Sequence, residues 1–234
     1  MKPVAVFRHS PGEGPGYFAT FLERQGLPWN LISIDAGEAV PEAVDSYSGL
    51  VFMGGPMSAN DPLPWVAQEL ALIGEAVARD IPVLGHCLGG QLMAKAMGGT
   101  ITRNPVKEIG WGEVQVENNA VARDWFDGTG DFLAFHWHGE TFSLPPGATH
   151  ILRSPYCANQ AFALGPHLAM QCHVEMTPGM VTQWCDIGSA EIAAHPGPAV
   201  QAPAVIQQEM AARLTALNAV AETLYSRWIK GLKV

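Results

Sequence analysis

The sequence predicts an α/β protein, a three-layer sandwich built on a mixed, mostly parallel sheet. In the first hundred residues, short apolar runs alternate with stretches whose apolar residues recur at helical spacing, as in a parallel sheet covered on both faces. Beyond about residue 100, strand candidates are short and separated by Pro/Gly turns, which indicates antiparallel strands. Since 48% of the 234 residues are hydrophobic and 15% are charged, the chain can bury a sizeable core.

The individual elements follow from these patterns in chain order. Strands are expected first at 4–7, 31–35, 49–53 and 81–84, with helices at 17–25, 65–78 and 88–97, the last closed by a Gly-Gly pair. Further strands are expected at 113–116, 132–135, 150–153, 160–163 and 168–171.

The C-terminal segment differs in composition from the rest. Residues 189–204 are rich in Ala and Pro and are expected to form an irregular connection, followed by a helix over 205–230. The apolar residues of this helix recur every three or four positions and form a stripe that needs a partner surface. We therefore expect one domain over 1–188 and a linker with an amphipathic helix, 189–234, packed on it; a homodimer contact is the alternative.

Charge and cysteine content exclude several classes of protein. The 13 Lys and Arg against 22 Asp and Glu give a net charge of −9, which disfavours nucleic-acid partners and binding to anionic membranes through a basic patch. No apolar run approaches the ~20 residues of a membrane-spanning helix, and we expect no secretory signal. The four cysteines are far apart in the sequence and indicate reduced thiols, hence a cytoplasmic protein.

Cys87 lies in the most informative stretch, Gly85-His86-Cys87-Leu88-Gly89-Gly90-Gln91. A small residue two positions before and two after a nucleophile permits a sharp strand-to-helix turn that exposes the side chain between them. The following helix dipole favours negative charge on the sulfur, and the Leu88 N–H can serve an oxyanion hole. An inert cysteine in a Gly-rich turn is the alternative, since cysteine is common in cores.

A second constellation, Gln171-Cys172-His173-Val174-Glu175, is expected to end a strand. Side chains two apart on a strand point to the same side, so His173 and Glu175 can touch, while Cys172 faces the core. A carboxylate that orients an imidazole toward a distant thiol has the logic of a catalytic triad.

Two further motifs carry weaker signals. The paired glycines Gly54-Gly55 directly follow a strand and would let a backbone N–H approach a ligand; an ordinary turn is the alternative. His136 and His138, two residues apart, could hold Zn²⁺ with His173 or a carboxylate as the third ligand. No second motif at a fixed spacing supports that rival metal site.

Together, residues 54–56, 85–91, 138–140 and 173–175 resemble the class I glutamine amidotransferase family in order and rough spacing. The resemblance covers about 45–180 and is nearest to stand-alone domains similar to the glutaminase part of GMP synthase. It implies the flavodoxin-like class I amidotransferase fold, with glutamine or a γ-glutamyl compound as substrate and neither a metal nor a cofactor.

The resemblance also implies roles for individual residues. Cys87 would attack the γ-carboxamide, His173 would protonate the departing ammonia and later activate water, and Glu175 would orient His173. The N–H groups of Gly55 and Leu88 would hold the oxyanion.

The substrate's amino-acid end would, by the same resemblance, be held by Gln91 and by the backbone around Trp137 and Gly139. The chain departs from the family pattern at three positions. His86 replaces an apolar residue and could stabilise the thiolate or point away. Val174 replaces the usual proline, and Trp137 replaces a serine, which bears on the shape of the glutamine pocket.

Several functions therefore compete. The first is an amide hydrolase whose ammonia passes to a synthase partner, or a γ-glutamyl hydrolase that needs no acceptor. A non-catalytic regulatory module that kept the fold is a second, motivated by Trp137 and by the absence of a synthase domain from these 234 residues. A thiol protein with Cys87 as redox sensor, ranked against Cys157 and Cys185, is the third.

Overall fold

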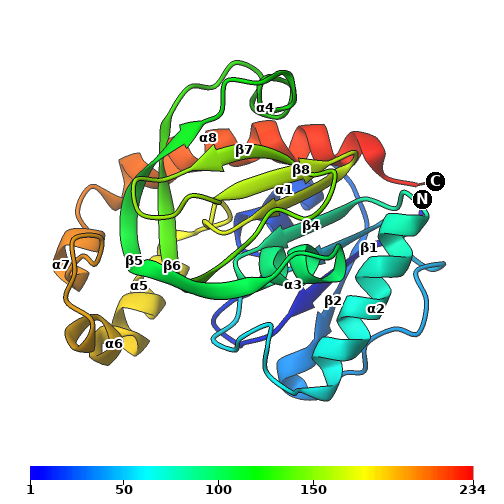
Figure 1. Ribbon diagram of the computed structural model, residues 1–234, viewed down its shortest axis with the longest axis horizontal. Helices are drawn as coiled ribbons and strands as arrows, with labels where there is room; N and C mark the ends of the chain where they lie inside the picture. The colour runs from blue at the N-terminus through cyan, green and yellow to red at the C-terminus, as the bar shows by residue number, and fades with distance from the viewer. Residues whose placement is uncertain (234) are drawn as a thin grey trace.

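The computed structural model describes residues 1–233 and arranges them as one nine-stranded mixed sheet with helices on both faces (Figure 1). The strands are β1 (Val4–Arg8), β2 (Trp29–Ser33), β3 (Gly49–Phe52), β4 (Val83–His86), β5 (Ile101–Val116), β6 (Phe132–Phe142), β7 (Thr149–Arg153), β8 (Ala161–Leu164) and β9 (His167–Met170). The helices are α1 (Tyr17–Arg24), α2 (Pro64–Ala78), α3 (Leu88–Ala96), α4 (Ala120–Phe126), α5 (Pro178–Ile187), α6 (Ser189–Ala194), α7 (Pro203–Ile206) and α8 (Met210–Trp228), with 3₁₀ segments η1 (Ile34–Ala36) and η2 (Ile229–Gly231).

The strand order, β2-β1-β3-β4-β9-β8-β7-β5-β6, divides the sheet into two parts. The first five strands pair in parallel, and the remaining strands continue the sheet antiparallel, as the sequence patterns predict. In a parallel sheet the segments that follow the strands emerge at one edge, where ligands usually bind. The segments after β1, β3, β4 and β9 therefore converge.

Side chains of the parallel strands pack on both sides of the sheet, which makes the three layers. Along β1, Val4 and Val6 belong to the apolar cluster that includes α1 and α8, whereas Ala5 and Phe7 belong to the cluster that includes α2 and α3. All four are at most 1% exposed, which explains why this strand is continuously apolar rather than alternating.

The C-terminal stripe is buried against the chain's own core. Leu214, Leu217, Leu224 and Trp228 of α8 lie in the same cluster as α1, and α8 runs along one face of the sheet (Figure 1). The predicted helix over 205–230 is shorter than expected because Glu209 has a left-handed backbone (φ 51°) that separates α7 from α8. The irregular connection expected over 189–204 contains the short helices α6 and the start of α7, so that expectation is wrong there. A domain division at residue 188 stays a prediction.

Two strands are much longer than the sequence patterns indicated. The expected strands at 113–116 and 132–135 are parts of β5 and β6, which pair antiparallel along most of their length, with an irregular register between Arg103 and Glu108. Parts of β5 and β6 line a cavity, described below. The polar residues there interrupt the alternation of apolar and polar side chains by which a strand is predicted. Helices α4 and α5 were not expected either.

Within residues 1–233, no helix combines the length and apolar character that crossing a bilayer requires. All four cysteines are buried and free.

Candidate active site

Cys87 lies on the sharp bend between β4 and α3. Its φ of 50° and ψ of −106° are strained for a residue other than glycine, and such strain is typical of turns that present a nucleophile. A Cβ built on Gly85 would lie 2.5 Å from the Gly89 backbone, and one on Gly89 would lie 2.0 Å from the Phe52 carbonyl oxygen. Glycine is therefore required at both positions for α3 to start so close to β3 and β4.

His173 and Glu175 follow β9 and contact each other directly. His173 Nδ1 lies 2.6 Å from Glu175 Oε1, and each residue is 1% exposed. The strand ends at Met170, three residues before His173, so the expected continuation of the strand through these residues is wrong. The position of His173 is set instead by its backbone N–H, which donates to the Phe135 carbonyl of β6 at 2.8 Å.

The electrostatics of this pair favour the charged forms of both groups. Burial lowers the pKa of His173, but the Glu175 carboxylate and the neighbouring Cys87 thiol outweigh it and hold the pKa well above 6.5. Burial likewise would raise the pKa of Glu175, yet His86 and His173 bring it down to about 2. In the described part of the chain, His173 Nε2 has no hydrogen-bond partner. The imidazole thus has one nitrogen on a carboxylate and the other free on the side of a thiol.

Cys87 as a whole is 7% exposed, and its sulfur contacts two polar groups. The Cys87 thiol donates to the Trp137 carbonyl at 3.8 Å, and Gln171 Nε2 donates to Sγ at 3.4 Å. Gln171 Oε1 in turn accepts from Gln91 Nε2 at 3.1 Å. Gln171 was not among the predicted site residues. It directly follows β9, which pairs with β4, the strand just before Cys87, so the strand order could have indicated that Gln171 lies near the thiol.

Glu175 has a second buried histidine as a neighbour, His86, which is hydrogen-bonded to the C-terminal helix. A hydrogen bond of 3.0 Å joins His86 Nε2 to the Tyr225 hydroxyl of α8, and the same nitrogen lies 3.6 Å from Glu175 Oε2. Burial lowers the pKa of His86, and the Glu175 carboxylate opposes that shift. The sequence left open whether His86 would stabilise the Cys87 thiolate or point away; its ring contacts Tyr225 and Glu175 instead.

The Gly54-Gly55 turn after β3 is held by a buried ion pair. His9 Nδ1 faces the carbonyl oxygens of Met53 (3.0 Å) and Gly54 (3.3 Å), and His9 Nε2 lies 3.0 Å from Glu69. Since these partners are acceptors, both ring nitrogens donate; burial lowers the pKa of His9, and Glu69 outweighs it and raises the pKa. The C=O and N–H of a trans peptide point in opposite directions, so a Gly54 carbonyl bonded to His9 turns the Gly55 N–H away from His9.

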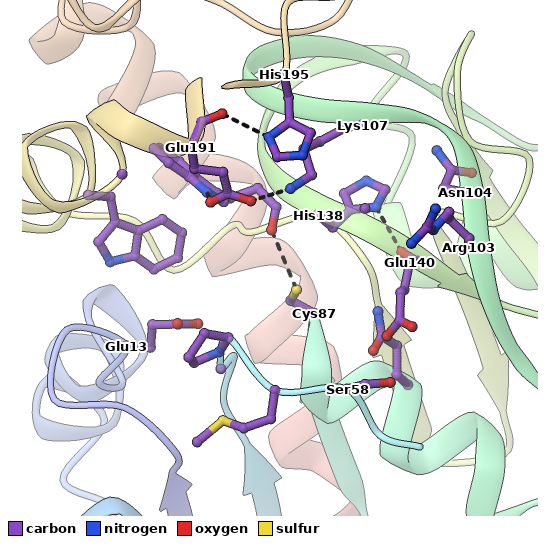
Figure 2. A pocket seen from close by; sticks show the side chains of 18 of the residues that line it. Glu13, Ser58, Cys87, Arg103, Asn104, Lys107, His138, Glu140, Glu191 and His195 are labelled. Atoms are coloured by element: carbon purple, nitrogen blue, oxygen red, sulfur yellow. Dashed lines mark hydrogen bonds and ion pairs between the residues drawn. The ribbon is translucent and has the colours of Figure 1, made fainter. Parts of the chain in front are cut away.

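These elements surround one cavity of about 730 Å³ (Figure 2). Cys87, Gly55, Gln91, Trp137 and Gly139 all line it, so most of the predicted site residues share one space. Leu88 is buried at the first position of α3, where a helix leaves its N–H groups without intrahelical partners. Ionisable side chains complete the lining: Glu13, Arg103, Lys107, Glu140, Glu191 and His195.

The ring of Trp137 is packed against the wall and leaves the cavity open. A Cβ built on Gly188 would lie 2.1 Å from the ring, and the Trp137 indole N–H donates to Glu191 at 2.9 Å. The ring also packs edge-on against Trp184. The tryptophan found where the family usually has serine therefore shapes the wall without filling the pocket.

The histidines of the rival metal site form a hydrogen-bonded network beside this cavity. One ligand atom each from Glu108, His136 and His138 lies within 4.8 Å of the others. The Glu108 carboxylate already accepts from His138 (3.0 Å), Ser154 (2.8 Å) and Gln160 (2.8 Å). This complete set of donors favours a closed polar network over a metal centre.

Glu13 is the main cavity residue that the sequence patterns missed. It lies in the loop between β1 and α1, at the carboxyl edge of the parallel strands. The general rule that ligands bind at this edge could have singled it out.

The comparisons with known proteins agree with this geometry. The family model "Glutamine amidotransferase class-I" matches residues 20–183. The chain belongs to the class I glutamine amidotransferases. A glutamine amidotransferase-like protein of Salmonella typhimurium, YfeJ, is 31% identical over 72% of this chain and 74% of its own length. The crystal structure of a glutamine amidotransferase from Methylobacillus flagellatus is 46% identical and superimposes with a TM-score of 0.97, covering 100% of this chain and 96% of that one.

Other class I relatives are larger or act on other γ-glutamyl compounds. GMP synthase of Aeropyrum pernix is 33% identical over 62% of this chain, but the matched part spans only 27% of that enzyme. Gamma-glutamyl peptidase 3 of Arabidopsis thaliana is 26% identical over 68% of this chain and 69% of its own length.

Proposed function

We propose that this class I amidotransferase hydrolyses the γ-amide of glutamine through a cysteine thioester and releases ammonia. One observation carries the proposal: the imidazole of His173 is held by Glu175 at 2.6 Å, with Nε2 free, and its other polar neighbour is the thiol of the strained residue Cys87. The arrangement supplies a nucleophile that lines the cavity, with an acid–base group and an orienting carboxylate buried next to it.

In the proposed acylation step, the Cys87 thiol gives its proton to His173 Nε2, and the resulting thiolate attacks the γ-carbonyl carbon and forms a tetrahedral oxyanion. The N–H groups of Gly55 and Leu88 stabilise that charge. The C–N bond then breaks, and His173 gives its Nε2 proton to the departing nitrogen.

Deacylation reverses these roles. A water molecule loses a proton to the now neutral His173 and attacks the thioester, which releases glutamate and restores the thiolate–imidazolium pair. Glu175 holds the imidazole in place throughout, and Gln91 with the backbone of Trp137 and Gly139 holds the amino-acid end of the substrate.

Affinity labelling tests the proposal directly. A glutamine-like diazo-ketone should alkylate Cys87 alone, because Cys157 and Cys172 are buried and burial raises the pKa of Cys157 to about 11 and that of Cys172 further. Peptide mass spectrometry locates the adduct.

An activity assay is the second test. Wild-type protein should release ammonia from glutamine and Cys87→Ala should not, whereas Cys185→Ala, the matched control, should retain the wild-type rate. Folded protein with an unlabelled Cys87, or equal ammonia release by wild type and Cys87→Ala, would contradict the proposal and favour a non-catalytic or redox role.

A second candidate, hydrolysis of a γ-glutamyl peptide without any acceptor, is favoured by the size of the cavity. At about 730 Å³ it suits a ligand larger than glutamine, and Arg103 offers positive charge to a peptide carboxylate, whereas Lys107 is already paired with Glu191. The relative from Arabidopsis, a gamma-glutamyl peptidase, also supports this candidate. A ratio of kcat/KM for a γ-glutamyl dipeptide to that for glutamine above one, falling in Arg103→Ala, would support this candidate.

The two candidates differ in the partner that they need. Free ammonia is useful only beside an acceptor, so the glutaminase candidate implies a synthase partner, as in the larger relatives, whereas the peptidase candidate implies none. Ammonia release that rises severalfold when a candidate synthase is added would favour the first.

A further inference from the structure

The carboxyl group of Glu13 lies in the cavity but has no role in the proposed chemistry. It lines the same wall as Cys87, and its side chain makes no hydrogen bond or ion pair with any residue in the part of the chain that the structure describes. Figure 2 shows Glu13 and Glu140 on opposite sides of Cys87. The residue is half-buried, and an ionised carboxylate is an acceptor only, so Glu13 is available to accept a hydrogen bond from a ligand in the cavity.

The position of this carboxyl group beside His173 follows from the glycine between them. A Cβ built on Gly54 would lie 2.3 Å from Glu13 Oε2 and 3.2 Å from His173 Cε1. The sum of these two distances, about 5.5 Å, is the upper limit on the separation of the two atoms. Cε1 is bonded to Nε2, the nitrogen proposed to protonate the leaving group. Glycine at position 54 thus leaves room for a carboxyl group next to the acid.

The loop that carries Glu13 is tied to the site at both ends. The Trp184 indole N–H donates to the Gly12 carbonyl at 2.8 Å, and the Tyr17 N–H donates to the Glu175 carbonyl at 2.7 Å. A Cβ on Gly16, which has φ +50°, would lie 2.3 Å from that same Glu175 carbonyl, so the close approach needs glycine. The carboxyl group is therefore held at a defined place.

We propose that Glu13 forms the leaving-amine subsite: its carboxylate accepts a hydrogen bond from the N–H of the scissile γ-amide and holds the amine after the C–N bond breaks. The inference rests on the proposed hydrolysis at Cys87 and deepens it. The subsite selects substrates with an N–H at the scissile position, that is, γ-glutamyl amides over γ-glutamyl esters. Glu13 forms and breaks no covalent bond; the proton on the departing nitrogen comes from His173.

The ionisation of Glu13 fits such a role. Burial raises its pKa to about 7; His173 and His9 oppose the shift, and Glu175 adds to it. Near neutral pH the group is therefore charged in part of the molecules, and an N–H donor arriving at the subsite favours the carboxylate.

The test compares two substrates that differ only in the leaving group, which is an amine in one and an alcohol in the other. L-Glutamine and L-glutamate γ-methyl ester share the acyl group, and both poor leaving groups need the proton of His173, but only the amide offers an N–H to Glu13. For Glu13→Ala, we expect kcat/KM for glutamine to fall about 10- to 100-fold, the effect of one hydrogen bond to a charged group, while kcat/KM for the ester changes less than threefold. Glu13→Asp should recover part of the amide rate, and Glu140→Gln, the matched control from the opposite wall, should keep the wild-type amide-to-ester ratio.

The outcomes separate this inference from the function on which it rests. An equal loss for both substrates in Glu13→Ala would assign Glu13 a general electrostatic or structural role and overturn the inference, as would no loss for either. In both cases the hydrolysis itself would stand. Wild-type protein that turns over neither substrate and whose Cys87 resists the diazo-ketone would overturn the function and the inference together. Circular dichroism and urea unfolding of each variant identify a misfolded one; if Glu13→Ala misfolds, Glu13→Leu, which also lacks an acceptor but is closer in size to glutamate, replaces it.

Discussion

The bend that carries Cys87 depends on a contact that a single methyl group would destroy. In Gly89→Ala, the new Cβ would lie 2.0 Å from the carbonyl oxygen of Phe52, whereas ordinary contacts begin at 3.4 Å. Helix α3 and the end of β3 must therefore separate by about 1.4 Å, and these two elements carry the two proposed oxyanion donors. A displacement of this size in catalytic geometry costs about 100-fold in rate.

Stability should fall as well, despite the better helix propensity of alanine. Alanine gains about 1 kcal/mol over glycine in a helix, and overpacking a core costs about 1–3 kcal/mol. Because the clash is with backbone rather than with a flexible side chain, we take the upper figure and expect a net loss of about 2 kcal/mol. The urea midpoint at an unchanged m-value reports this loss, and glutamine hydrolysis reports the activity.

Gly74→Ala is the matched control, since Gly74 lies inside helix α2 and nothing stands within 4 Å of its built Cβ. It should raise the free energy of unfolding by about 0.5–1 kcal/mol and leave activity unchanged. If Gly89→Ala is as stable and as active as Gly74→Ala, the steric argument for the bend is refuted.

Three further predictions follow from the buried polar groups. Glu175→Gln should lower kcat by about 10³- to 10⁴-fold with the fold intact, because His173 loses the carboxylate that orients it; a loss below tenfold would contradict this. Glu69→Gln breaks a buried ion pair and should cost about 3–5 kcal/mol in urea unfolding at pH 6. Since the folded pKa of His9 is raised, its contribution is complete below pH 6.5 and declines as pH rises through the folded pKa, so the difference between wild type and Glu69→Gln should shrink at alkaline pH. Tyr225→Phe should cost about 1 kcal/mol, the contribution of one hydrogen bond, and an unchanged stability would show that the hydroxyl contact is weak.

Local patterns were sufficient for the parallel half of the fold. Strands β1, β3 and β4 are buried on both faces, so their sequences are continuous apolar runs. The glycines around Cys87 indicate a tight backbone bend that residues with larger side chains could not form. The antiparallel half was harder to predict. Strands β5 and β6 have polar residues where they line the cavity, and so lose the alternation by which a strand is recognised.

The sequence by itself determined the α/β class, the family and the residue types for a thiol, an imidazole and a carboxylate, because each depends on short-range spacing. Only the tertiary structure decided which distant side chains meet. Glu13 follows β1, Gln171 follows β9 and Cys87 follows β4, three segments far apart in the sequence. Their proximity arises because parallel strands end at one edge of the sheet, a consequence of strand order that spacing along the chain does not record.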